Sequence, residues 1–291
     1  MKMTAKTKLI DLLRKILQLS LPEKTLQKIA KDKPEGSLAY KLLPRNYQYK
    51  PNFANREISL NKIRFNLDIS DLIGWYLYFG FKDHSTEIIF NLCNEGDSVI
   101  DVGANIGYVS LNIAQKVGAN GKIISFEPDP LNFQRLSKNL SLNNFQNIVL
   151  ENKGLAQKSG ELNLMVFEES NRGMNRIVPQ GSTNAKSVKV NVVRLDDYLN
   201  ENPLEKLNLI KIDVEGYEMN VLQGAQQTIQ KFKPQLFIEL DDNNLKAQGS
   251  NAQGLIKYLI DLGYSIHRSD SQETLTADYS FENCHFDIIC R

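Results

Sequence analysis

This sequence of 291 residues has few cysteines, almost no net charge and no long apolar run. Its three cysteines, Cys93, Cys284 and Cys290, are too few and too scattered for a disulfide framework or a cysteine-based zinc site, and they favour a reducing compartment. The net charge of +1 creates no overall field for nucleic acid. No run approaches the roughly 18 uninterrupted apolar residues of a transmembrane helix. We therefore expect a cytoplasmic protein with no nucleic-acid partner.

The composition is otherwise that of an ordinary globular protein. Hydrophobic residues make up 42% of the chain and charged residues 24%, which argues against disorder, collagen and coiled coil. A chain of this length can bury one large α/β core, or one core with a small appendage.

Positive charge is concentrated at the N-terminus. Residues 1–33 hold nine Lys and Arg against three Asp and Glu, a net charge of +6, which leaves the rest of the chain at −5. Apolar residues recur there at helical spacing: Leu9, Leu12, Leu13, Ile16 and Leu19. A basic amphipathic helix can lie on a membrane surface. The alternative, which we favour because amphipathic helices usually face a core, is that this stripe packs on the body of the protein.

The next segment lacks regular periodicity. Residues 34–66 are rich in proline and asparagine, which predicts an irregular connector with short extended pieces. We therefore place a boundary after residue 70, with an N-terminal extension over residues 1–70 and one domain over residues 71–291.

From there the chain alternates short apolar runs with helical stretches. The predicted strands are residues 98–102, 122–127, 147–151, 207–213, 235–240, 264–267 and 285–289. Strands separated by helices predict a doubly wound, mostly parallel sheet of the α/β class. Between the third and fourth strands, residues 161–167 and 187–194 alternate in polarity and predict an antiparallel hairpin with a mobile tip.

The strongest local signal is the sequence from Asp101 to Gly107, where a strand ends and a helix begins. Ligands of open α/β sheets bind at the carboxyl ends of the strands, and glycine lets the backbone approach them closely. Glu127 ends the next strand and can accept hydrogen bonds from a ribose diol. The candidate cofactor-binding residues are Asp101, Gly103, Asn105, Gly107, Glu127, Pro128, Asn152 and Asp213.

The electrostatics of this loop favour one adenosine cofactor over another. The spacing is not G-x-G-x-x-G, and a carboxylate at Asp101 disfavours a pyrophosphate. S-adenosylmethionine carries an ammonium and a sulfonium but no phosphate. We therefore predict the methyl donor rather than a dinucleotide.

The fourth strand supplies the candidate catalytic residues. Strand alternation puts Lys211 and Asp213 on one face, with Asp213 at the edge where ligands bind. A carboxylate there can orient an acceptor hydroxyl, take its proton or bind a metal. Lys211 stands in an apolar strand and needs a carboxylate partner, for which Glu239 at the end of the fifth strand is a candidate. The candidate catalytic residues are Asp213, Lys211 and Glu239.

Acidic residues continue into the following helix, where Glu215 and Glu218 extend the pattern. An acidic first turn stabilised by the helix dipole explains them equally well.

Four motifs in this order resemble the FkbM-type methyltransferases: residues 99–107, 126–128, 194–198 and 210–216. The resemblance covers about residues 70 to 290. It implies the seven-stranded fold of class I methyltransferases, S-adenosylmethionine as donor, and a hydroxyl acceptor on a sugar or natural product. The N-terminal 70 residues lie outside it.

We therefore predict O-methylation of a hydroxyl on a sugar, glycan, lipid or natural product. One alternative is a transferase assisted by a divalent metal, with Asp213, Glu239 and Asp241 as oxygen ligands, although their spacing does not show convergence and we assign no metal residue. Another is a donor-binding protein without catalysis that associates with membranes through its basic helix.

Two further groups of residues have simpler explanations. His84, His267 and His285 are scattered, and we expect them to be structural or exposed. The aromatic cluster over residues 75–81 is expected to pack in a core, with an acceptor pocket as the alternative.

Overall fold

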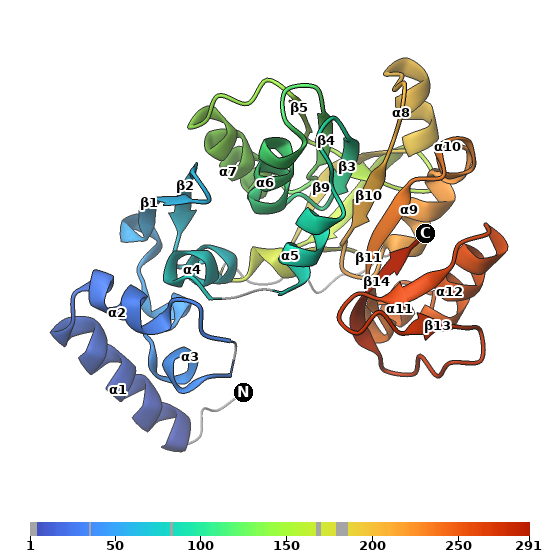
Figure 1. Ribbon diagram of the computed structural model, residues 1–291. Helices are drawn as coiled ribbons and strands as arrows, with labels where there is room; N and C mark the ends of the chain where they lie inside the picture. Colours follow the sequence, from blue (N-terminus) through green and yellow to red (C-terminus); the bar gives the residue numbers. More distant parts are fainter. Residues whose placement is uncertain (1–4, 35, 82–83, 167–169, 179–185) are drawn as a thin grey trace. The chain divides into compact units, whose positions relative to one another are not determined.

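The computed structural model describes residues 5–34, 36–81, 84–166, 170–178 and 186–291 (Figure 1). The chain forms two compact units, one of residues 1–83 with 168–173 and the other of residues 84–167 with 174–291. The change of unit thus falls after the boundary predicted at residue 70, because the helix that follows residue 71 belongs to the first unit.

The first unit combines short helices with a hairpin. Its elements are α1 (Ala5–Ser20), α2 (Glu23–Ala30), α3 (Leu38–Leu42), η1 (Asn46–Gln48), η2 (Pro51–Phe53), β1 (Asn55–Leu60), β2 (Ile63–Asp68) and α4 (Leu72–Phe79). Strands β1 and β2 pair antiparallel through Asn61 and Lys62, which both have positive φ, as a two-residue hairpin turn of the right twist requires. The irregular connector predicted over residues 34–66 therefore contains a regular hairpin.

The aromatic cluster forms the core of this unit. Trp75 is fully buried, its Nε1 donates to the carbonyl of Pro44 at 2.7 Å, and its ring stacks on Phe81 with centroids 5.2 Å apart. The core-packing expectation for these residues is confirmed.

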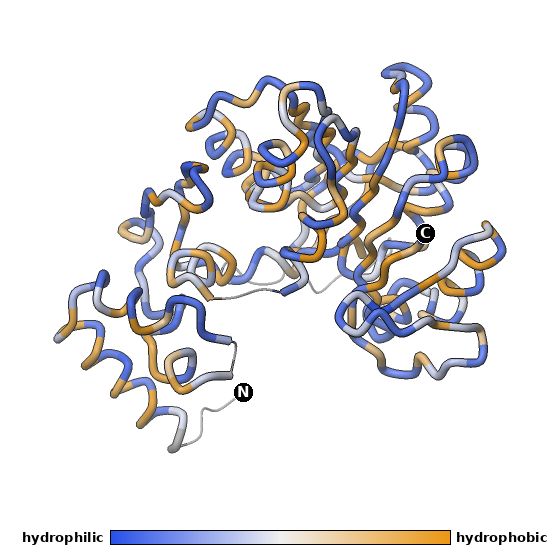
Figure 2. The backbone as a smooth tube through the Cα atoms, viewed as in Figure 1, coloured by the Kyte–Doolittle hydropathy of each residue, from blue (hydrophilic) through white to orange (hydrophobic). Residues whose placement is uncertain are grey.

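Helix α1 departs from expectation. Figure 2 shows hydrophobic residues recurring along α1. Their side chains are exposed, from Leu9 at 60% to Leu19 at 79%, so the stripe does not pack on the core of its own unit, contrary to expectation. No helix among the described residues is both long and apolar enough to cross a lipid bilayer.

The second unit contains the large sheet and its helices. Its strands are β3 (Ser98–Val102), β4 (Lys122–Phe126), β5 (Ile148–Glu151), β6 (Gly154–Leu155), β7 (Gly160–Met165), β8 (Arg176–Val178), β9 (Ser187–Val193), β10 (Leu209–Ile212), β11 (Gln235–Asp241), β12 (Ile266–Arg268), β13 (Thr274–Leu275) and β14 (His285–Cys290). Its helices are α5 (His84–Asn91), α6 (Tyr108–Val117), α7 (Pro130–Ser141), α8 (Leu195–Glu201), α9 (Glu218–Gly224), α10 (Gln226–Phe232), α11 (Asp242–Ala247) and α12 (Ala252–Asp261). The short helix η3 (Arg172–Met174) lies where the chain passes between the units.

The large sheet confirms the predicted fold class. Its order is β13-β12-β14-β11-β10-β3-β4-β5, and β11, β10, β3, β4 and β5 are parallel while β14 runs antiparallel to β11. These are the seven predicted strands with the two-residue strand β13 added. Successive residues of β3 enter different apolar clusters, Val99 with Ile113 of α6 and Ile100 with Leu222 of α9. Both faces of the sheet are therefore buried, as in a doubly wound α/β fold.

A smaller sheet has the order β6-β9-β7-β8. Strands β7 and β9 pair antiparallel, as predicted for residues 161–167 and 187–194, and β8 adds a strand that was not predicted. Much of the predicted mobile tip, residues 179–185, lies outside the described residues.

Candidate active site

The loop of residues 103–107, here called the donor loop, follows β3 at the carboxyl edge of the sheet. Gly103 and Gly107 have φ values of +81° and +87°, and Asn105 has a φ of 51°. A Cβ on Gly103 would lie 2.0 Å from the carbonyl oxygen of Asp213, and one on Gly107 would lie 2.4 Å from Leu136 Cδ1. Both glycines are thus required by the conformation and packing of the loop itself.

Glu127 fixes the shape of the donor loop from the end of β4. Its carboxylate accepts from the backbone N–H of Asn105 at 2.7 Å and of Asp129 at 2.9 Å, and burial raises its pKa to about 7. A carboxylate oxygen can accept two hydrogen bonds, so each oxygen keeps room for a further donor such as a ribose hydroxyl. Asn152 donates to the carbonyls of Glu127 and Pro128, at 2.9 and 3.3 Å, and so supports this strand end.

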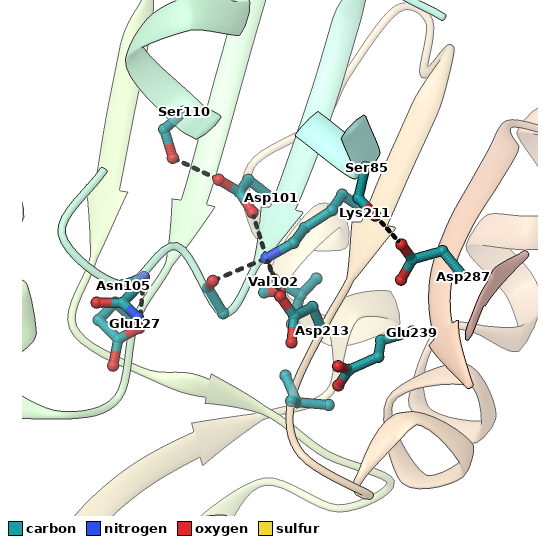
Figure 3. Close-up of polar contacts among 12 residues, drawn as sticks. Ser85, Asp101, Val102, Asn105, Ser110, Glu127, Lys211, Asp213, Glu239 and Asp287 are labelled. Atoms are coloured by element: carbon teal, nitrogen blue, oxygen red, sulfur yellow. Dashed lines mark hydrogen bonds and ion pairs between the residues drawn. The ribbon is translucent and has the colours of Figure 1, made fainter. Parts of the chain in front are cut away.

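A chain of buried polar groups joins β4, α6, β3 and β10, and Figure 3 shows its part from Ser110 through Asp101 to Lys211. Ser125 donates to Ser110 at 2.9 Å, and Ser110 donates to Oδ2 of Asp101 at 2.5 Å. Asp101 is fully buried, and its Oδ1 lies 3.3 Å from Nζ of Lys211. In this structure Asp101 therefore pairs with protein groups, and its predicted contact with a donor stays a prediction.

Lys211 continues this chain to the sheet edge. Its ammonium donates to the carbonyls of Val102 and Gly103, at 3.3 and 2.9 Å, and lies 3.4 Å from Oδ2 of Asp213. Burial alone would lower the pKa of Lys211, but the carboxylates of Asp213 and Asp101 raise it above its ordinary value. The expectation that Glu239 is its partner is wrong, because these two aspartates hold the ammonium.

Three carboxylates meet beyond the end of β10. Asp213, Glu215 and Glu239, here called the carboxylate trio, each offer an oxygen within 4.8 Å of the others. Figure 3 shows Glu239 directed toward Asp213. Within the described part of the chain, Oε2 of Glu239 is buried and has no hydrogen-bond partner. Burial and the nearby charge of Asp213 raise the pKa of Glu239 to about 10 and that of Glu215 to about 7.

The groups around the trio come from distant parts of the sequence. Asn244 donates to Oε2 of Glu215 at 2.9 Å, and Arg176 donates to Oδ1 of Asn244 at 3.1 Å. Nδ1 of His285 lies 2.7 Å from Oδ2 of Asp241, and Nε2 of His285 lies 3.8 Å from Oε1 of Glu239. The sequence alone does not place His285 here, because its position follows from the antiparallel register of β11 with β14.

Asp241 does not join the carboxylate trio. Its Oδ1 accepts from the backbone N–H of Asn244 and caps α11, while its Oδ2 faces His285. The metal ligand set considered from the sequence, with Asp241 as a member, is therefore corrected to one with Glu215. The structure does bring the three candidate catalytic residues together at one sheet edge.

The sequence matches the Methyltransferase FkbM domain over residues 101–266. It is 31% identical to Methyltransferase 1 of Beauveria bassiana over 162 residues, which cover 50% of this chain and 65% of that protein. It is also 31% identical to Methyltransferase sdnD of Sordaria araneosa over 179 residues, 51% of this chain and 69% of that protein.

A third curated relative is the hexuronic acid methyltransferase AglP of Haloferax volcanii, 28% identical over 143 residues, 49% of this chain and 56% of that protein. The matched regions span 56% to 69% of the length of these relatives. Among solved structures, the methyltransferase FkbM from Methylobacillus flagellatus superposes with a TM-score of 0.44 and 20% identity over 67% of this chain and 43% of that one. The domain match covers the donor loop and the trio, and the chain belongs to the FkbM methyltransferase family.

Proposed function

We propose that this protein transfers a methyl group to a hydroxyl oxygen of a sugar, glycan, lipid or natural product. The observation that carries the proposal is the position of Asp213, whose side chain is 46% exposed at the carboxyl edge of the sheet while its neighbours Asp101 and Lys211 are buried. A half-exposed carboxylate beside the donor loop can reach an acceptor hydroxyl. The name of the relative AglP, a hexuronic acid methyltransferase, supports a sugar acceptor.

The family confirms S-adenosylmethionine as the donor, and the residues present fit it. Glu127 has free acceptor positions for a ribose diol, and Asn105 and Gly103 hold the backbone of the donor loop beside it. When bound, the donor supplies an electrophilic methyl group on its sulfonium.

The charges at the site assign different roles to the three candidate catalytic residues. Lys211 stays protonated, so it does not take a proton but fixes the carboxylate of Asp213. Glu239, with a pKa of about 10, is protonated at neutral pH, so it can donate a hydrogen bond to a ligand but does not accept a proton. Asp213 is therefore the residue that orients the acceptor hydroxyl or takes its proton.

A metal-assisted transfer is the second candidate, and the carboxylate trio favours it. Three convergent carboxylate oxygens suit a hard cation such as Mg²⁺, which Asp213, Glu215 and Glu239 would hold. The cation would polarise an acceptor oxygen and favour ionised carboxylates at the trio. Location in the cytoplasm stays a prediction.

The test uses the full-length chain with S-adenosylmethionine carrying a ¹³C-labelled methyl group, and glucuronic acid glycosides and neutral glycosides as acceptors. A new ¹³C methoxy resonance in the product is expected, and it should depend on Asp213. A methyl group found on nitrogen, on carbon or on the carboxylate of the glucuronic acid would overturn transfer to a hydroxyl. Tight binding of the donor without transfer to any acceptor would favour the non-catalytic alternative.

A further inference from the structure

Helix α1 presents its apolar side to solvent. Leu9, Leu12, Leu13, Ile16 and Leu19 are 60%, 57%, 44%, 49% and 79% exposed. At about 100° per residue, these positions form one stripe about 120° wide along the helix. Side chains of this size are not usually left in water in such a contiguous row.

The opposite, polar side of α1 faces its own unit. Arg14 is buried, donates twice to the carbonyl of Lys41 at 2.7 and 3.0 Å, and pairs with Asp11 at 2.7 Å. Tyr47 donates to the carboxylate of Asp11 at 2.9 Å, and Gln48 donates to the backbone carbonyl of Asp11 at 3.1 Å. These hydrogen bonds fix the rotation of α1 about its own axis. The fold of the first unit therefore directs the stripe away from that unit.

The charge beside the stripe is positive. Lys8 and Lys15 are exposed and follow one border of the stripe on the helix surface. Residues 1–33 carry a net charge of +6, whereas the remaining residues carry −5. A surface with leucine and isoleucine side chains bordered by lysine complements an anionic bilayer, where apolar groups enter the acyl boundary and ammonium groups meet the headgroups.

We propose that α1 lies in the plane of an anionic phospholipid membrane, with the stripe of Leu9, Leu12, Leu13, Ile16 and Leu19 inserted at the level of the acyl chains. The contact is peripheral and reversible, because it depends on one helix and a few charges. It is a property of the first unit and does not depend on which acceptor the second unit methylates.

The experiment is co-sedimentation of the full-length chain with large vesicles of phosphatidylcholine, with and without 30% phosphatidylglycerol. We expect binding to the anionic vesicles that weakens as salt is raised. The variant with Leu9→Ser, Leu12→Ser, Ile16→Ser and Leu19→Ser should lose at least about tenfold in partition coefficient, since each leucine or isoleucine contributes through its buried area. The matched control is Ile260→Ser with Val149→Ser, two exposed apolar residues of the second unit, which should bind like the wild type.

Charge is tested separately with Lys8→Gln and Lys15→Gln. Each substitution should weaken binding to anionic vesicles by roughly fivefold and leave the weak binding to neutral vesicles unchanged. If the circular dichroism spectrum of the serine variant shows that it is not folded like the wild type, the two lysine variants alone test the proposal.

Three results would overturn the proposal. The first is no binding of the wild type to anionic vesicles at low salt, and the second is equal binding by the serine variant in its folded state. The third is a wild-type dimer in sedimentation velocity that the serine variant converts to a monomer without any vesicle binding, because a second copy would then cover the stripe.

Discussion

Nζ of Lys211 lies 3.3 Å from Oδ1 of Asp101, across the pairing of β10 with β3. Both side chains are almost wholly buried, in strands whose other residues, apart from Ser98, are apolar. A buried ion pair of this kind adds little net stability by itself, but removing one partner leaves the other charge uncompensated. The pair therefore has more influence on the geometry of the sheet edge than on the free energy of folding.

Replacing Lys211 by methionine is expected to lower the free energy of unfolding by about 3–5 kcal/mol, because Asp101 would lose its counter-charge. Lys153→Met is the control, since Lys153 pairs with Glu151 at 2.9 Å where both side chains are partly exposed. The control should cost less than about 1 kcal/mol in urea denaturation. Equal losses in the two variants would contradict a special role for the buried pair.

Asp213→Asn keeps the shape of the side chain and removes its charge. We expect turnover to fall by roughly 10²–10⁴-fold with donor affinity unchanged, as for a group that orients the acceptor or takes its proton. Asp261→Asn, at an exposed position in α12, is the control and should keep full activity. Normal turnover of Asp213→Asn would remove the catalytic role and leave a purely structural one.

Glu127→Ala should weaken binding of S-adenosylhomocysteine by about 1.5–3 kcal/mol, the range for hydrogen bonds to a charged group. Isothermal calorimetry measures this directly. Glu161→Ala, an exposed position in β7, serves as the control. NAD should not bind either protein detectably, and an unchanged affinity for the cofactor product would show that Glu127 does not hold the ribose.

The carboxylates at the sheet edge predict how stability depends on pH. Burial raises the pKa of Glu127, Glu215 and Glu239 above the ordinary value of a glutamate, to about 7, 7 and 10. A raised pKa favours the folded state while the group is protonated, so stability should fall as pH rises from about 4.5 through 7 and onward to 10. Glu239→Gln should flatten the fall above pH 7, which melting temperatures across this range will show.

Divalent cations distinguish the two candidate mechanisms. If the trio holds Mg²⁺, millimolar Mg²⁺ should raise the melting temperature of the wild type at pH 8 and release protons, because binding favours ionised carboxylates. Glu239→Gln should reduce both effects. A transfer rate that does not change after treatment with a chelator would exclude the metal-assisted reaction.

Truncation separates the two N-terminal helices. Deleting residues 1–20 removes α1 and should leave donor affinity unchanged. Deleting residues 1–33 also removes α2, whose Glu23 accepts from Arg56 at 2.7 Å and from Tyr78 at 2.9 Å. We expect the longer deletion to make the first unit sensitive to limited proteolysis while the second unit still binds the donor. Loss of donor binding in the shorter deletion would show that α1 contributes to the donor site.

Sequence periodicity was enough to predict the sheet and the residues at its carboxyl edge, because strand ends in a parallel sheet converge whatever the loops do. It was not enough to predict which charged side chains pair with one another. Lys211 lies in register with Asp101, whereas Glu239 lies further along its own strand, and only the pairing of β10 with β3 and β11 decides between them. The place of His285 beside Glu239 likewise depends on an antiparallel register.

The orientation of α1 shows a different limit. An amphipathic pattern states that two sides of a helix differ, but it does not say which side faces protein. Here the buried bonds of Arg14 to the carbonyl of Lys41 decide it, and these depend on residues 27 positions apart. The hairpin of β1 and β2 was missed for a local reason, since its turn is Asn61-Lys62 rather than the usual Asn-Gly.

Because Gly103 has no side chain, the loop that follows β3 packs directly against the backbone that follows β10. Any larger residue would push directly on the carbonyl of Asp213, which a Cβ would approach to 2.0 Å. The carbonyl of Gly103 is in turn held by the ammonium that also holds the carboxylate of Asp213. The distance between the donor loop and the proposed catalytic carboxylate is therefore set by the backbone, so a change of acceptor is easier to engineer in the segments outside these two loops.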